Sequence, residues 1–454
     1  MTPDLPLPDL PLPAGSITDS SITDRPITNG SITDRPITDR PAAVVPVPDG
    51  PFPAGLTPDD LLPVRLTPDD LPAYVYDLAS LDEHAAAVRA ALPGIELYYA
   101  VKANPDPELL RVLARHVDGF EVSSGGELAH VRGLFPGARV ALGGPGKTDA
   151  ELSAEVTRLH VESPGELRRL LASGRRADVL LRVNLDVPVA GASLAMGGGA
   201  TPFGMDPGGI AECVALLSGQ DTVRLRGIHA HLASGLEAPA LLELAAAVLE
   251  YARGLGVTEI NLGGGMAVSY ADPDARFDWR SYGEGLAGLR RPGEVLRIEP
   301  GRALTVYCGR YVTRVIDVKR VHGELFAVVA GGTHHLRTPA TKGHSQPLAA
   351  LPPGEPVTVV GQLCTPKDVL AHRVPVRLAV GDVVEFAMAG AYAWNISHHD
   401  FLMHPKPGFH YRPAPGIRRL SSGGTYSAAE NRGDALDARQ EREHESIIRF
   451  PGGR

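Results

Sequence analysis

The chain has 454 residues, enough for at least two domains and a large buried core. Its formal net charge of -9 and isoelectric point near 6.0 argue against non-specific binding to nucleic acid, and its three cysteines are too few for a disulfide framework. Because the sequence has neither an apolar run long enough to span a bilayer nor a visible secretory signal, we expect a cytoplasmic protein with no membrane or nucleic-acid partner.

Both ends of the chain are predicted to lie outside the folded domains. Residues 1–55 contain short repeated phrases rich in proline and small polar residues, which cannot form a packed core, so we predict a disordered tail. Residues 413–454 are polar and charged and are predicted to be a flexible tail. Residues 56–80 contain a short alternating strand near Tyr74, which we expect to join a C-terminal β domain.

Residues 81–303 alternate between apolar strands and helical patterns. The predicted strands are 95–101, 119–123, 138–143, 158–162, 178–184, 224–232, 258–263 and 295–299. Helical patterns lie between them, for example at 107–116, 125–134, 164–172 and 238–254, with one poor helix between 267 and 291. Eight consecutive strand–helix units predict a (β/α)8 barrel, with a doubly wound open sheet as the structural alternative.

After the barrel the pattern changes. Residues 304–412 contain predicted strands without intervening helices, at 312–319, 325–330, 357–360 and 383–387. Strands joined by glycine- and proline-containing turns indicate a separate antiparallel β domain.

The first predicted barrel strand ends at Lys102. Catalytic groups of barrel enzymes lie at the C-terminal ends of the strands. An ammonium group in this position has lost much of its water, so we expect its pKa to fall toward neutrality, and a neutral amine can form a Schiff base with a carbonyl. The alternative is a lysine that extends from the strand end into solvent.

The sixth predicted strand carries His229 and His231, with Ser234 just beyond it. Residues two apart on a strand point to the same side. We interpret His229 as a satisfied core histidine and His231, which is nearer the strand end, as a functional residue.

The seventh strand ends in Gly263, Gly264 and Gly265, and the eighth in Glu299 and Arg302. A glycine triplet is often only a turn, but it also lets backbone N–H groups approach an anion closely. Barrel phosphate sites commonly use the loops after strands seven and eight, so these glycines and Arg302 are predicted to hold a phosphate. A Schiff-base lysine, a phosphate site and a buried carboxylate together indicate pyridoxal 5'-phosphate (PLP), because the carboxylate would keep the pyridine nitrogen protonated.

The segments 99–104, 229–231, 263–265 and 299–302 resemble fold-type III PLP-dependent decarboxylases, which include the diaminopimelate and ornithine decarboxylases. The resemblance runs from about residue 73 to residue 411 and implies an alanine-racemase-like barrel, a β domain and a head-to-tail homodimer with shared active sites. It implies that Lys102 forms the Schiff base, that His231 stacks on PLP and that Glu299 pairs with the pyridine nitrogen. The implied phosphate contacts are Ser234, Gly264, Gly265 and Arg302.

Two β-domain motifs extend the resemblance. Segment 361–368 is similar to the one whose cysteine reaches the partner subunit's active site, so Cys364 is implied to be the acid that protonates Cα after CO2 leaves. The alternative for Cys364 is inert packing. Segment 389–392 is similar to the one that supplies a tyrosine to the phosphate or the substrate, which adds Tyr392.

The same motifs indicate the class of substrate. Racemases of this fold place an arginine against the pyridine nitrogen. This chain has Glu299 at that position, so the racemase branch is disfavoured. The ornithine and diaminopimelate enzymes have an acidic residue after the cysteine that binds the substrate's distal amine; here Thr365 follows, with Lys367 nearby, which argues against a plain diamine product.

The segment that contains His335 and Arg337 and continues to Lys342 and His344 is rich in basic groups, which suits an acidic substrate, although a solvated basic loop is the alternative. With segment 395–400, it is similar to the siderophore-biosynthesis branch that decarboxylates citryl-diaminopropionate. We therefore predict a decarboxylase of that type, without a metal ion. The alternatives are a diaminopimelate, ornithine or lysine decarboxylase and, less favoured, a catalytically silent binding relative.

Overall fold

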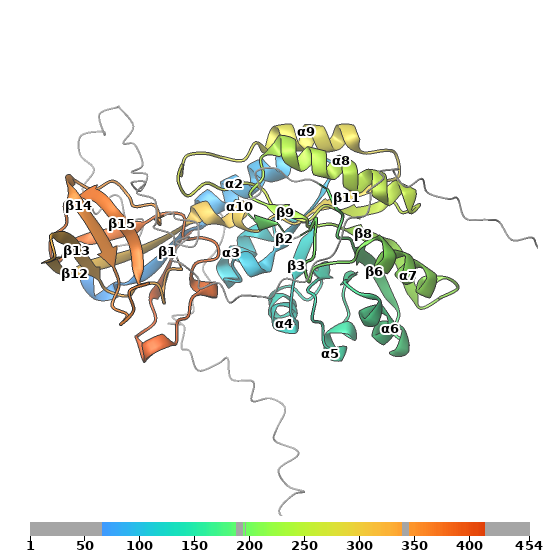
Figure 1. The fold of residues 1–454 in the computed structure, drawn as a ribbon, viewed down its shortest axis with the longest axis horizontal. Helices are drawn as coiled ribbons and strands as arrows, with labels where there is room; N and C mark the ends of the chain where they lie inside the picture. Colours follow the sequence, from blue (N-terminus) through green and yellow to red (C-terminus); the bar gives the residue numbers. More distant parts are fainter. Residues whose placement is uncertain (1–65, 188–193, 196, 338–344, 414–454) are drawn as a thin grey trace, which may run out of the picture. The chain divides into compact units, whose positions relative to one another are not determined.

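The computed structural model describes residues 66–187, 194–195, 197–337 and 345–413 (Figure 1). The predicted tail at 1–55, and all of the predicted C-terminal tail except residue 413, lie outside the described residues. The predicted fold class is confirmed, because a closed parallel barrel and a separate, mostly antiparallel sheet are both present.

The barrel closes in the order β10-β11-β2-β3-β4-β5-β6-β8. Pairing of Ile298 on the last strand with Leu97 on the first completes the ring, which excludes the open-sheet alternative. The eight strands match the predicted ones to within a few residues: β2 (Glu96–Ala100), β3 (Gly119–Val122), β4 (Val140–Leu142), β5 (Arg158–Val161), β6 (Ala177–Arg182), β8 (Val223–His229), β10 (Glu259–Asn261) and β11 (Val295–Ile298).

Helices surround the barrel strands (Figure 1). Several begin at a side-chain cap, as where the Ser124 and Ser163 hydroxyls accept backbone N–H groups of the first turn. The poor helix expected between 267 and 291 begins only after Asp278, whose carboxylate caps it. The helices are α2 (Leu78–Ala91), α3 (Pro107–Leu113), α4 (Gly125–Leu134), α5 (Asp149–Leu152), α6 (Pro164–Ala172), α7 (Pro207–Leu217), α8 (Ala238–Gly254), α9 (Trp279–Leu289) and α10 (Arg302–Thr305).

The β domain is a seven-stranded sheet in the order β15-β14-β13-β12-β1-β17, with β16 paired to β12. The short strand near Tyr74 lies in this sheet as β1, between β12 and β17. Two pairings, β1 with β17 and β13 with β14, are parallel, so the sheet is not wholly antiparallel. The strands are β1 (Ala73–Asp77), β12 (Gly309–Val321), β13 (Glu324–Val329), β14 (Pro353–Val360), β15 (Val369–Val376), β16 (Val383–Phe386) and β17 (Gly408–Arg412); the short pair β7 (Leu194–Ala195) and β9 (Ala233–Ser234) lies apart.

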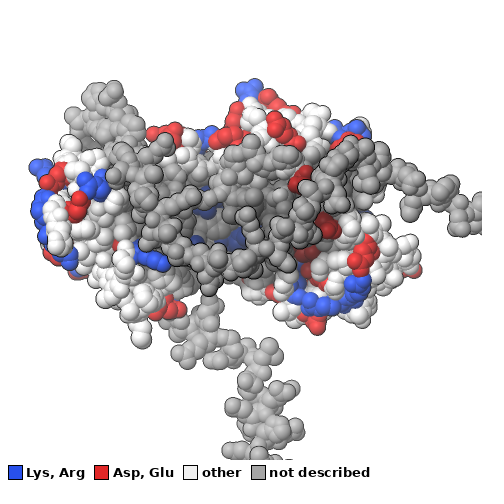
Figure 2. All heavy atoms as spheres, viewed as in Figure 1, with Lys and Arg blue, Asp and Glu red and all other residues white. Residues whose placement is uncertain are grey.

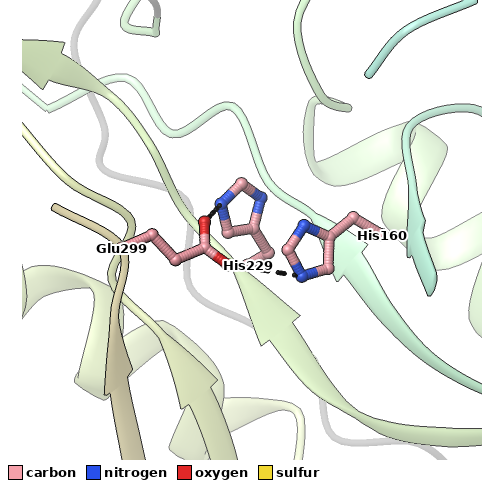
Figure 3. A group of neighbouring side chains, drawn as sticks. All are labelled: His160, His229 and Glu299. Carbon is pink, nitrogen blue, oxygen red and sulfur yellow. Dashed lines mark ion pairs between the residues drawn. The ribbon is translucent and has the colours of Figure 1, made fainter. Parts of the chain in front are cut away.

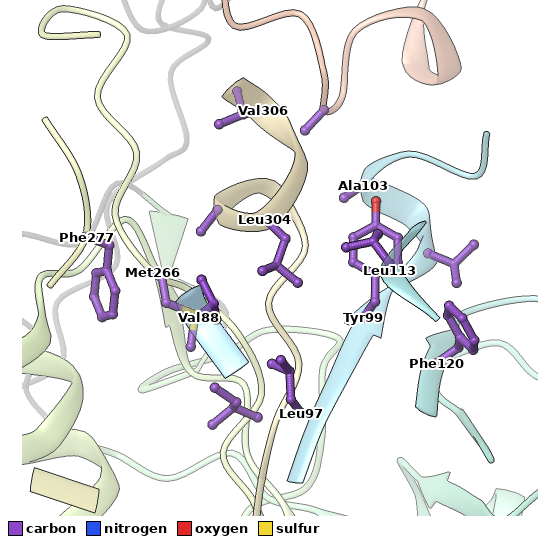
Figure 4. Packing of buried hydrophobic residues seen from close by; sticks show 14 of the residues in the cluster. Val88, Leu97, Tyr99, Ala103, Leu113, Phe120, Met266, Phe277, Leu304 and Val306 are labelled. Atoms are coloured by element: carbon purple, nitrogen blue, oxygen red, sulfur yellow. The ribbon is translucent and has the colours of Figure 1, made fainter. Parts of the chain in front are cut away.

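Side chains of the barrel strands alternate between two environments. Leu97 and Tyr99 of β2 belong to the apolar core, with residues such as Leu113 and Leu304 (Figure 4). The intervening positions carry polar groups into the barrel, where the fully buried Arg297 lies 2.8 Å from Glu259. The interior of this barrel is therefore lined by charge pairs rather than by aliphatic layers.

On the outside, acidic and basic side chains are interspersed over the described surface visible in Figure 2. Among the described residues, the helices are all too short or too polar to cross a membrane.

Candidate active site

Lys102 lies in a single 3-10 turn, Val101–Ala103, directly after β2. The β domain fixes the backbone of this turn. The Asn395 side-chain amide donates to the Lys102 carbonyl over 2.8 Å, and the Tyr392 N–H donates to the Ala103 carbonyl over 2.8 Å. The predicted nucleophile is thus positioned by both domains.

The partner of the Lys102 amine is Glu121, a buried carboxylate on the neighbouring strand β3. The Ser123 hydroxyl donates to the other oxygen of this carboxylate over 2.9 Å. Burial is the largest single influence and pulls the pKa of Lys102 down. The charge and hydrogen bond of Glu121, with smaller contributions from Tyr392 and Glu299, together outweigh burial and raise the pKa above its usual value. The predicted fall of this pKa is therefore wrong, because the sequence did not reveal a carboxylate in contact with the amine.

The backbone of the glycine triplet 263–265 packs closely against the ends of neighbouring strands. Gly263 and Gly265 have φ values of 67° and 105°, which favour glycine. A Cβ at Gly264 would lie 2.6 Å from the Glu299 carbonyl oxygen, and one at Gly265 would lie 2.3 Å from the Ala233 carbonyl oxygen. Carbonyl oxygens of neighbouring strand ends therefore occupy the space that side chains would need, and the Gly263 and Gly264 N–H groups donate to Asn261 and His231.

His231 is hydrogen-bonded to this triplet. The Gly264 N–H donates to its Nδ1 over 2.9 Å, and its Nε2 lies 3.4 Å from the Ser234 hydroxyl. Burial, with the nearby positive charges of Lys102 and Arg182, lowers the pKa of His231 to about 3. His231 is therefore a neutral, flat ring at neutral pH, suited to stacking on another ring rather than to pairing with an anion.

Arg302 lies between two tyrosines. Its guanidinium donates to the Tyr270 hydroxyl over 2.6 Å, and its Cζ lies 4.6 Å from the centre of the Tyr392 ring. Tyr392 itself has a φ of 49°, an uncommon conformation for a residue other than glycine. Arg302 and Tyr392 were predicted from the sequence, whereas Tyr270 was not.

Glu299 is buried, just beyond the end of β11. The Asn261 side-chain amide donates to its Oε1 over 2.6 Å. His229 Nε2 lies 3.3 Å from Oε2, and His160 Nε2 lies 3.8 Å from Oε1 (Figure 3). We call Glu299, Asn261, His229 and His160 the Glu299 cluster.

Within the described residues, His160, His229 and Glu299 form the one group of side chains close enough together to hold a metal ion. The two imidazoles are stacked, with ring centres 4.2 Å apart and planes 14° from parallel (Figure 3). A metal ion lies in the plane of each imidazole that binds it, and two stacked planes do not meet at one ion. The arrangement favours hydrogen bonding to Glu299 over metal binding.

The geometry fits PLP. An amine, the Arg302 guanidinium near a close glycine turn, a neutral imidazole and a buried carboxylate lie around the C-terminal ends of the barrel strands. These are the groups needed for a Schiff base, a phosphate, a ring face and a ring nitrogen.

In the β domain, Cys364 is exposed on a loop fixed by a buried carboxylate. Asp368 accepts the N–H groups of Leu363 over 2.8 Å and Thr333 over 2.6 Å. Thr365 on the same loop is half-buried, and Lys367 is exposed. The loop therefore presents the thiol in a defined place on the surface of its own subunit.

The other predicted substrate residues lie in different environments. His335 is buried, its Nε2 lies 2.8 Å from the Pro405 carbonyl oxygen, and its Nδ1 lies 3.1 Å from the Tyr311 hydroxyl. Because both ring nitrogens have protein partners, this placement does not support direct contact of His335 with substrate. Arg337 is exposed. Lys342 and His344 lie outside the described residues.

Four polar residues of the barrel interior were missed by the sequence analysis: Glu121, His160, Asn261 and Arg182, whose guanidinium donates to Glu162 over 2.7 Å. Each of them occupies a strand position whose side chain points into the barrel. In several cases another polar side chain points inward two residues away, as Arg158 and His160 do on β5. Alternation of polar and apolar residues within the predicted strands was the available signal.

Comparison with known proteins gives an independent result. Residues 78–306 match the family described as pyridoxal-dependent decarboxylase, pyridoxal binding domain. The chain is 37% identical over 372 residues to a Staphylococcus aureus protein named 2-[(L-alanin-3-ylcarbamoyl)methyl]-2-hydroxybutanedioate decarboxylase, covering 74% of this chain and 93% of that one. It is 36% identical over 347 residues to a diaminopimelate decarboxylase of Actinosynnema pretiosum, covering 71% and 79%.

Among solved structures, the fold is similar to that of diaminopimelate decarboxylase from Helicobacter pylori complexed with L-lysine. The TM-score is 0.69 at 22% identity, over 78% of this chain and 93% of that one. At this identity the likeness shows the fold alone.

The Lys102–Glu121 contact yields a direct test. Glu121→Gln removes the charge that raises the pKa of Lys102, so at pH 8 more of the amine is neutral, and its reaction with a small aldehyde plus a reducing agent should quicken by about tenfold. The rate is measured on the cofactor-free protein by mapping modified peptides. An unchanged dependence of this rate on pH would contradict the assigned partner.

Proposed function

Because the chain belongs to the pyridoxal-dependent decarboxylase family, and is therefore a PLP-dependent carboxy-lyase, we propose that it decarboxylates an amino acid already joined to citrate. The observation that carries this proposal is the similarity to the S. aureus protein, which extends over both domains. The name of that relative describes an L-alanine joined at carbon 3, through an amide, to a citrate skeleton. We propose the same substrate class here, as a cytoplasmic step of siderophore biosynthesis.

We propose that the residues around the barrel mouth hold PLP. Bound there, PLP supplies an electron sink for the electron pair left behind when the α-carboxylate departs as CO2. Lys102 would bind it covalently, His231 would lie on its ring face and Glu299 would face its ring nitrogen. Its phosphate would be held by Ser234, Gly263, Gly264, Gly265, Arg302 and Tyr392.

The chain's own charges suit these roles. Glu121 holds the Lys102 amine in place beside β3. Glu299 is approached by an amide and two imidazoles rather than by a lysine or arginine, so its negative charge remains available to a protonated ring nitrogen. Arg302, held by Tyr270 and Tyr392, offers a fixed positive charge to an anion.

We propose that Cys364 donates the proton that Cα needs once CO2 has left, and that it does so in the active site of a partner subunit. Its exposure and its rigid loop support this role, because a thiol that serves a partner must be presented at the surface. The proposal implies a head-to-tail homodimer in which each site takes residues from both subunits.

The substrate's additional carboxylates require positive charge rather than negative charge at the far end of the site. Thr365 is neutral where related diamine-forming enzymes carry an acid, and the exposed Lys367 and Arg337 provide cations on the same domain. We propose these three residues as substrate contacts. The second candidate is diaminopimelate decarboxylation, favoured by the 36% identity to the Actinosynnema enzyme.

The substrate class is tested by measuring CO2 release from citryl-diaminopropionate and from diaminopimelate, ornithine and lysine. We expect kcat/KM for the citrate conjugate to exceed that for each free diamino acid by roughly 100-fold or more, since neutral Thr365 stands where a carboxylate would bind a distal ammonium. Lys102→Ala is the inactive control. A preference for diaminopimelate would overturn the citrate proposal and leave the decarboxylase assignment in place.

Sharing of sites between subunits is tested by mixing two inactive variants, Lys102→Ala and Cys364→Ala. If each site uses Lys102 of one subunit and Cys364 of the other, half of the randomly assorted dimers contain one intact site, so about a quarter of the wild-type activity should return. Each variant incubated alone is the control. No recovery, despite exchange of subunits shown by mass spectrometry, would mean that both residues act within one chain.

A further inference from the structure

Asn261 links the glycine triplet to Glu299 and has a fixed orientation. Its Oδ1 accepts the Gly263 N–H over 3.0 Å, so its NH2 group must point the other way. That group lies 2.6 Å from Glu299 Oε1 and 3.5 Å from His160 Nε2. One oxygen of the carboxylate is therefore anchored to the same loop that would hold the cofactor's phosphate.

The second oxygen of Glu299 faces His229. This imidazole is 4% exposed, its Nε2 is 3.3 Å from Oε2, and among the described residues neither ring nitrogen has an aligned hydrogen-bond partner. A buried imidazole whose two nitrogens lack hydrogen-bond partners lowers the stability of the fold, so a functional role for this side chain is expected. The sequence analysis interpreted His229 as a satisfied core histidine, which the unpaired nitrogens contradict.

Two features define the state of the His229 ring. Burial and the positive charge of Arg182 hold its pKa well below the usual range, so the ring is neutral and carries a single N–H. Stacking against His160 fixes the plane of the ring, and that plane brings Nε2 close to the carboxylate (Figure 3). A neutral donor can orient a carboxylate without cancelling its charge.

Resting on the proposed pairing of Glu299 with the ring nitrogen of PLP, we propose that His229 is a positioning residue for Glu299. With PLP bound, its Nε2–H would donate to Oε2, which lies 3.3 Å away, while Asn261 holds Oε1, and the two donors would keep the carboxylate turned toward the ring nitrogen. His160 supports the arrangement by stacking on His229 and by accepting from Asn261.

Two variants separate the hydrogen-bond donor from the ring. His229→Phe keeps a flat ring that can stack on His160 but has no N–H, whereas His229→Gln has no ring but can place an N–H near the original Nε2. The full-length protein, freed of cofactor, is titrated with PLP and with an analogue in which carbon replaces the ring nitrogen. Binding is followed by tryptophan fluorescence, and the ratio of the two Kd values is compared within each variant.

We expect the wild type to prefer PLP, and His229→Phe to lose about tenfold in PLP affinity while its affinity for the analogue changes by less than about twofold. His229→Gln should keep the wild-type preference. Comparing two ligands on one variant cancels any general damage to the site, because both ligands need the same folded protein.

Equal weakening of both ligands in His229→Phe, or loss of the preference in His229→Gln but not in His229→Phe, would overturn the positioning role. Glu299→Gln distinguishes this failure from failure of the proposed function. If Glu299→Gln abolishes the preference while His229→Phe keeps it, only the role of His229 is wrong. If Glu299→Gln keeps the preference, the pairing of Glu299 with the ring nitrogen is wrong as well.

Discussion

Burying charge inside the barrel is the constraint on which this active site depends. An ionised side chain moved from water into protein costs several kcal/mol unless a partner compensates it. Below the mouth, Arg297 lies between Glu96 and Glu259. Beyond the end of β4, buried Lys147 pairs with Glu166 of α6 over 2.8 Å. Within each pair the opposite charges compensate each other. Lys102 and Glu299, which lie nearer the mouth, are then left with their own separate partners.

The groups nearest the proposed cofactor site are a cation and an anion that must not neutralise each other. If Lys102 and Glu299 formed an ion pair with each other, Glu299 would no longer be available to a protonated ring nitrogen. Glu121 binds Lys102 from the adjacent strand, while the Asn261 amide donates to Glu299. Each charge therefore has its own partner, and the β domain secures the backbone turn that carries the amine.

The sequence predicted the scaffold well because its patterns are local. Apolar runs of the length of a strand and helical periodicity between them located the eight barrel strands, and the positions of Lys102, Glu299 and the glycine triplet follow from where those strands end. Partners on neighbouring strands were not predictable in this way. Glu121 and His160 lie on strands other than those of Lys102 and Glu299, and the closed barrel brings them together.

Two interpretations failed for the same physical reason, which is the influence of neighbours from distant parts of the chain. The pKa of Lys102 was expected to fall on burial alone, whereas Glu121 in contact with the amine, together with Tyr392 and Glu299, reverses the direction. His335 was assigned to a basic substrate loop, whereas the sheet buries it and occupies both of its nitrogens.

The central claim is that Glu299 holds a proton on the ring nitrogen of PLP. Nitrogen-15 NMR of the holoenzyme, loaded with PLP labelled at that nitrogen, measures this directly. The account predicts a protonated nitrogen at neutral pH in the wild type and its loss in Glu299→Gln. An unprotonated ring nitrogen in the wild-type holoenzyme would contradict it.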